Sequence, residues 1–296
     1  MAFGHESAAT IYTLRSTRSL TSVAHGPARE AAAGFGALYL IVVFLIALVQ
    51  DRLLFPRWAM GDGIQLPVSA ERLTLRASGE ELAGLHLPAE TQPPEEAALI
   101  LGFGGNAWNA DALAIYLHSI FPDRDVVAFH YRGYAPSTGR PSARAILQDA
   151  LSIHDHLVAA AAPKRMIVAV GLSIGAGPAA YLAGKRAIAG LILVTPFDSL
   201  TALAREHYPW VPIGLLLRHR MEVADAIAAS SVPVALISAE KDTIVPPRRT
   251  EPLRKSAANL VLDRVIADAG HNDLYDRADF QRAMREALAL LEAGRW

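Results

Sequence analysis

The chain has 296 residues, no cysteine, and 28 Lys and Arg residues against 29 Asp and Glu residues. This length fits one large α/β domain or two small ones. The balanced charge provides no positive surface for nucleic acid. The absence of Cys excludes a disulfide scaffold, a thiolate nucleophile and a cysteine-based zinc site. Apolar residues make up 52% of the chain, which excludes disorder as its main state.

A long apolar segment lies near the N-terminus. Residues 31–49 contain no charge, and at 1.5 Å per residue they nearly span the roughly 30 Å hydrocarbon core of a bilayer. We predict a disordered tail over residues 1–30, a transmembrane helix over 31–50 and a catalytic domain over 51–296. A buried core helix and a cleaved signal peptide are the alternatives. A slight excess of Arg before the helix favours an extracytoplasmic catalytic domain.

The rest of the chain alternates between predicted strands and helices. An antiparallel hairpin is predicted over residues 73–87, around Ser78 and Gly79. The predicted parallel strands are 97–103, 126–130, 166–170, 188–194, 234–238 and 260–266. The predicted helices are 108–120, 143–161, 174–185, 247–257 and 274–293. This alternation indicates a doubly wound, mostly parallel α/β sheet, with a small lid at residues 199–231.

A Gly-x-Ser-x-Gly motif at residues 171–175 follows a predicted strand and opens a predicted helix. This context is typical of a nucleophile elbow, whose tight turn requires small residues on both sides of Ser173. A serine needs a base to accept its proton. His271 is the His after Ser173 that lies at the carboxyl end of a predicted strand. Asp242 is the predicted acid, with Glu240 as the second choice.

An oxyanion hole is the third requirement of such a site. One donor is expected to be the backbone amide of Ile174, directly after the candidate nucleophile. The second is expected from the glycine-rich loop after the strand at 97–103, where we favour the backbone amide of Asn106. An ordinary strand-to-helix turn is the alternative interpretation of that loop.

Several of these segments resemble one known family, over roughly residues 35–292. Residues 103–109 resemble its F-H-G-N-A-G-N motif, and residues 131–142 resemble its Y-R-G-Y-G-x-S-x-G-x-P-S motif. With the surroundings of Ser173, Asp242 and His271, they make the chain similar to membrane-anchored α/β-hydrolase-domain serine hydrolases. These include protein depalmitoylases and lysophospholipases. The resemblance implies an α/β-hydrolase fold.

The chain departs from this family at two positions. Gly104 stands where the family has His, and Trp108 stands where it has Gly. Gly104 leaves the backbone donor intact, whereas Trp108 either narrows the site or contacts the acyl group.

The sequence therefore predicts a serine hydrolase that cleaves an ester or thioester of a small-molecule, lipid or acylated substrate. It implies no cofactor, no metal and no nucleic-acid partner. A serine peptidase on the same residues and a catalytically silent, membrane-tethered scaffold are the alternatives.

Overall fold

The structure, a computed structural model, describes residues 26–61, 63–91, 97–160 and 166–294. It divides into two units, residues 1–46 and 47–296, which are described separately. Helix α1 (Gly26–Leu54) begins in the first unit and ends in the second. It is longer than the predicted 31–50, and by length and composition it could cross a membrane. Most of the predicted tail lies outside the described residues, and the division into tail, anchor and domain stays a prediction.

The second unit contains an eight-stranded sheet in the order β1-β2-β4-β3-β5-β6-β7-β8. Strands β1 and β2 form an antiparallel hairpin, β2 is antiparallel to β4, and all other pairs are parallel. The strand bounds are β1 Glu71–Ala77, β2 Glu80–Leu87, β3 Leu99–Phe103, β4 Val126–Phe129, β5 Ile167–Leu172, β6 Gly190–Val194, β7 Val234–Ala239 and β8 Leu260–Ile266.

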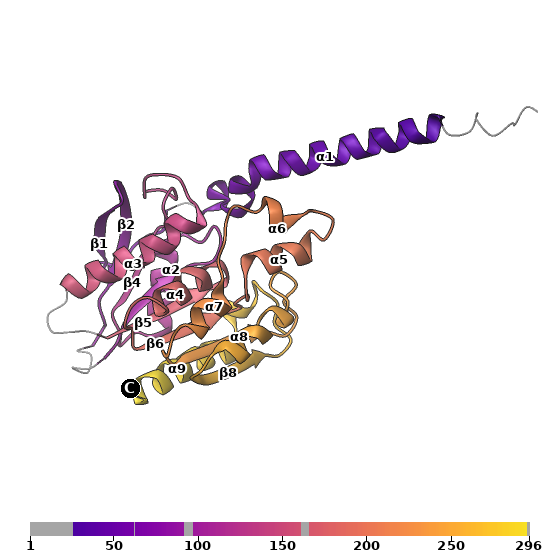
Figure 1. Ribbon diagram of the computed structural model, residues 1–296. Coiled ribbons are helices and arrows are strands. Elements are labelled where there is room, and N and C mark those ends of the chain that lie inside the picture. Colours follow the sequence, from indigo (N-terminus) through magenta and orange to yellow (C-terminus); the bar gives the residue numbers. More distant parts are fainter. Residues whose placement is uncertain (1–25, 62, 92–96, 161–165, 295–296) are drawn as a thin grey trace, which may run out of the picture. The chain divides into compact units, whose positions relative to one another are not determined.

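The central strands are uninterrupted apolar runs because helices cover both faces of the sheet (Figure 1). On one face Ile100 and Val170 pack with Leu113 of α2 and Phe280 of α9. Their chain neighbours alternate to the opposite face, where α4 contacts β5 and β6 and is flanked by α3 and α7. The helix bounds are α2 Ala110–Ile120, α3 Ala143–Ala160, α4 Ala176–Ala183, α5 Leu200–His207, α6 Ile213–Leu216, α7 Val223–Ala228, α8 Glu251–Ser256 and α9 Ala278–Ala293.

Most differences from the sequence prediction are at element ends. Strand β5 continues through Gly171 and Leu172, so the turn at Ser173 begins directly from the strand. The predicted lid segment at 199–231 contains three short helices, α5, α6 and α7. The parallel strands β3, β5, β7 and β8 all end at one edge of the sheet, and the loops that follow them carry the predicted site residues.

Candidate active site

Ser173 lies in a strained turn between β5 and α4. It opens a 3₁₀ turn, Ser173–Gly175, with a φ of 53°, a left-handed conformation that costs energy for any residue with a side chain. A Cβ on Gly171 would lie 2.6 Å from the carbonyl oxygen of Gly175, and a Cβ on Gly175 would overlap the carbonyl of Phe103. The two glycines are therefore needed where β5, the turn and the end of β3 come together.

The side chains of Ser173, His271 and Asp242 lie in a continuous row. His271 Nε2 is 3.0 Å from Ser173 Oγ, and His271 Nδ1 is 2.7 Å from Asp242 Oδ2. His271 follows β8 and Asp242 follows β7, so three separate loops bring the groups together. If Nδ1 carries the ring hydrogen and donates a hydrogen bond to the carboxylate, Nε2 is free to accept the Ser173 proton.

The Asp242 carboxylate is fixed on both oxygens. Its Oδ1 accepts hydrogen bonds from the backbone amides of Ile244 (2.9 Å) and Val245 (2.8 Å), which leaves Oδ2 for the imidazole. The side chain is only 1% exposed. The other carboxylates of this region are engaged elsewhere: Glu240 accepts from the amide of Asp268, and Asp268 pairs with Lys241.

The glycine-rich loop after β3 lies beside Ser173. A Cβ on Gly105 would be 3.8 Å from the Cβ of Ser173 and from the carbonyl oxygen of Leu172. Within the described part of the chain, neither the backbone amide of Asn106 nor that of Ile174 donates to another backbone group. Both amides are therefore available to a substrate oxygen, and their role as an oxyanion hole stays a prediction.

Two tyrosines that the sequence reasoning did not single out hold this loop. Tyr131 Oη donates to the carbonyl of Gly104 at 2.8 Å, and Tyr134 Oη donates to Asn106 Oδ1 at 3.2 Å. Burial raises the pKa of both phenols well above the usual range. They therefore remain protonated donors at any physiological pH. Both belong to the segment 131–142, so its resemblance to a family motif was the signal that could have found them.

The two departures from the family motif are neighbours in space. A Cβ on Gly104 would lie 3.4 Å from Trp108 Cβ and 3.4 Å from Leu113 Cδ2. The Trp108 ring packs edge-on against Tyr275, with centroids 5.0 Å apart. Tyr275 follows the His271 loop, and its burial raises the pKa of its phenol to about 12. Trp108 therefore bridges the loop after β3 and the loop that carries His271.

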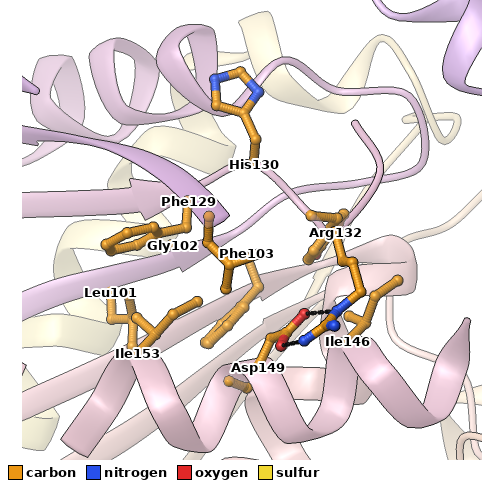
Figure 2. A pocket seen from close by; sticks show the side chains of 12 residues that line it. Leu101, Gly102, Phe103, Phe129, His130, Arg132, Ile146, Asp149 and Ile153 are labelled. Atoms are coloured by element: carbon orange, nitrogen blue, oxygen red, sulfur yellow. Dashed lines mark hydrogen bonds and ion pairs between the residues drawn. The ribbon is translucent and has the colours of Figure 1, made fainter. Parts of the chain in front are cut away.

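The rest of segment 131–142 has a structural role. Figure 2 shows the side chain of Arg132 forming two hydrogen bonds with Asp149 of α3, in a small cavity beneath the ends of β3 and β4. Arg132 also donates to the carbonyl of Ala77, at the end of β1. The hydrogen bonds with Asp149 raise the pKa of Arg132 above its usual range. This cavity does not include the candidate triad, and Arg132, which lines it, connects the loop after β4 with α3 and with the end of β1.

The apolar side chains of the segment at 199–231 differ in exposure. Ile213 and Leu217 are buried, whereas Tyr208, Trp210 and Leu215 are at least half exposed. Met221, which the sequence reasoning did not consider, is 1% exposed and lies beside Ile174 in a cavity near the site.

Curated proteins from bacteria and yeast are similar to this chain. Rv2307c of Mycobacterium tuberculosis is 33% identical over 211 residues, which cover 70% of this chain and 74% of the relative. YfhR of Escherichia coli K12 is 31% identical over 220 residues, covering 71% and 76%. YNL320W of Saccharomyces cerevisiae, described as a membrane protein, is 29% identical over 231 residues, covering 72% and 79%. No protein-family model matches the sequence.

Solved structures of α/β hydrolases have the same fold. The Pyrococcus furiosus esterase Pf2001 matches with a TM-score of 0.63 at 16% identity, over 78% of this chain and 95% of that chain. A membrane phospholipase A matches with a TM-score of 0.55 at 15% identity, over 90% and 97%. The predicted fold class is therefore confirmed. The chain belongs to the same family as Rv2307c and YfhR, and its fold is that of the α/β hydrolases.

Proposed function

We propose that this protein is a serine hydrolase that cleaves carboxylic esters or thioesters through an acyl-enzyme intermediate. The observation that carries the proposal is the row of hydrogen bonds from Ser173 Oγ through His271 to the buried Asp242 carboxylate. Two solved structures with the same fold are described as an esterase and a phospholipase A, which supports the same reaction class.

In the first half-reaction the Oγ of Ser173 attacks the substrate carbonyl carbon, and His271 Nε2 takes the hydroxyl proton. The carbonyl π electrons move onto the oxygen, which the amides of Ile174 and Asn106 stabilise; each such donor contributes about 3 kcal/mol. The tetrahedral intermediate then collapses. The bond to the alcohol or thiol breaks, and His271 returns the proton to that leaving group.

Water completes the cycle. His271 removes a proton from a water molecule as its oxygen attacks the acyl carbon, and the Ser173–acyl bond breaks with the proton returned to Oγ. Asp242 stays ionised throughout. It holds the imidazole in the required tautomer and stabilises the imidazolium that forms twice in the cycle.

The substrate class follows from the proposed anchor. We infer that the apolar part of α1, which by length and composition could cross a membrane, anchors the protein, as fits a relative described as a membrane protein. An anchored site meets lipid and acylated substrates at the bilayer surface. The slight excess of Arg before the helix favours a catalytic domain on the extracytoplasmic side. Alkaline carbonate should leave the full chain in the membrane pellet, and added protease should reach residues 51–296 only from the predicted side.

Labelling and hydrolysis together test the proposed reaction. The folded wild type should react with a fluorophosphonate probe and hydrolyse aryl esters and thioesters, and Ser173→Ala should do neither. Asp242→Asn should keep the fold and lower kcat by about 10⁴. Cleavage of peptides in preference to esters would identify a peptidase instead. Absence of labelling in folded wild type would identify a silent scaffold.

A further inference from the structure

A narrow apolar cavity lies behind the two candidate oxyanion donors. It is lined by Phe55, Tyr131, Tyr134, Ile146, Ile174 and Met221, together with Asn106. These residues come from the position directly after α1, the loop after β4, α3, the Ser173 turn, the segment at 199–231 and the loop after β3. Phe55, Tyr134 and Ile146 are buried and form a small hydrophobic cluster of their own, against which Ile174 packs.

The position of this cavity relates it to the acyl part of a substrate. In the proposed mechanism the substrate carbonyl oxygen lies between the amides of Ile174 and Asn106. The acyl chain is bonded to the same carbonyl carbon, so its first atoms lie within a few bonds of those amides. Both of these residues line the cavity, which therefore is an apolar space within reach of the acyl chain.

The cavity is short. Its free volume is about 10 Å³, room for about one water molecule. Phe55, which is 3% exposed, lies on the wall contributed by the end of α1. An acyl chain of more than about two or three carbons has to displace a packed side chain, and overfilling such a space is costly.

Phe55 is held in place by the chain around it. Its ring packs edge-on against His219, with centroids 5.0 Å apart. Asp51, one turn earlier, lies 2.8 Å from His219 Nε2, and Gln50 accepts a 2.8 Å hydrogen bond from the backbone of Arg218. The last turn of α1 is thus fastened to the segment at 199–231, which keeps the phenyl ring against the cavity.

From these contacts we infer that Phe55 is a specificity-determining residue that limits the acyl group to short chains. This rests on the proposed function, and it makes the end of the apolar helix a structural part of the active site. The leaving group, not the acyl chain, is then the part of the substrate that varies in size, for example the alcohol or amphiphile of a short-chain ester.

The test compares kcat/KM for p-nitrophenyl acetate, propionate, butyrate, hexanoate and octanoate, using the full chain in detergent. For the wild type we expect a steep fall beyond propionate. Phe55→Ala should raise the ratio of kcat/KM for hexanoate to that for acetate by about tenfold or more. Each methylene of the acyl chain that becomes accommodated in an apolar pocket contributes a factor of that order. The matched control is Trp58→Ala, since Trp58 is 84% exposed and does not line the cavity; its ratio should equal that of the wild type.

Each outcome decides the inference. The ratio within one preparation does not depend on the amount of folded protein. Should Phe55→Ala not fold, Phe55→Leu should shift the ratio in the same direction and Phe55→Trp should suppress propionate relative to acetate. An unchanged profile in these variants, or octanoate cleaved as fast as acetate by the wild type, overturns the inference. If fluorophosphonate still labels Ser173 and acetate is still cleaved, only the role of Phe55 fails; if neither occurs, the proposed function fails with it.

Discussion

The hydroxyl of Tyr131 donates a 2.8 Å hydrogen bond to the carbonyl of Gly104, at the start of the loop that carries Asn106. In a trans peptide the carbonyl and the following amide point in opposite directions, so fixing this carbonyl also fixes the amide of Gly105. Tyr134 holds the other end of the loop through the side chain of Asn106. The loop is therefore preorganised before substrate binds, which is what stabilisation of a transition-state oxyanion requires.

Removing these hydroxyls should affect the transition state more than substrate binding. Tyr131→Phe and Tyr134→Phe are each expected to lower kcat about three- to tenfold, the effect of one hydrogen bond, with KM nearly unchanged. Tyr181→Phe is the control, because it removes a 2.8 Å hydrogen bond with Gln148 on the outer helices. Steady-state kinetics on a thioester measures the effect. Equal losses in all three variants would assign the tyrosines to stability alone.

Gly104 and Trp108 should behave as a coupled pair. Gly104→His places an imidazole where the Trp108 side chain now packs, so the single substitution should lower both Tm and kcat/KM. Trp108→Gly alone should cost about 3 kcal/mol of stability, because it empties a partly buried site. The double variant Gly104→His/Trp108→Gly restores the family's residues and should recover about 1 kcal/mol or more relative to the sum of the singles. Chemical denaturation measures this coupling, and additive losses would show that the two positions are independent.

A buried carboxylate near the hairpin should make stability depend on acid pH. Burial alone would raise the pKa of Asp111, but hydrogen bonds with His130 and Arg72 outweigh it and hold that pKa below its usual value. A lowered folded-state pKa stabilises the protein above the usual carboxyl pKa, and this contribution disappears as the pH falls through the folded value. Asp111→Asn should lower the free energy of unfolding at pH 7 by about 2 kcal/mol. It should also make Tm fall less steeply as the pH is lowered through the acid range. If Tm of the variant falls as steeply at acid pH as Tm of the wild type, this assignment is contradicted.

The contact between Asp51 and His219 should influence acyl selectivity through Phe55. Asp51→Asn weakens the ion pair with Arg218 and the hydrogen bond with His219, so the cavity wall should loosen and the hexanoate-to-acetate ratio should rise about threefold, as expected for a partly exposed ion pair. Asp155→Asn is a matched control, because Asp155 also joins an Arg, Arg186, and a His, His154. The control should leave the ratio unchanged. A similar shift in both variants would mean that the effect is general destabilisation.

Much of the framework was predictable because it depends on local patterns. Short apolar runs placed all six parallel strands, and two glycines around Ser173 placed the turn. The order of the strands brings the loops of Asp242 and His271 to that turn, since the carboxyl ends of parallel strands share one edge. Asp268 lies only three residues before His271 in the sequence, but in the structure it pairs with Lys241.

The parts that the sequence could not supply depend on contacts between distant segments. Phe55 and Ile174 share a cavity although no periodicity relates them, and Tyr131 contacts Gly104 only because β3 and β4 are adjacent. The end of α1 was missed for a different reason. The apolar run stops at Val49, but the helix continues through Gln50, Asp51 and Arg52 to Leu54, and Gln50 and Asp51 bond with Leu216 and Arg218 of the second unit.

The mass of the acyl-enzyme tests the central claim most directly. Wild-type protein mixed with p-nitrophenyl acetate and quenched in acid within seconds should gain the mass of one acetyl group, located by fragmentation on Ser173. Ser173→Ala should gain none, and His271→Ala should gain it far more slowly. A folded wild type that never carries the acetyl group while releasing nitrophenol, or an adduct of equal yield in Ser173→Ala, would contradict Ser173 as the nucleophile.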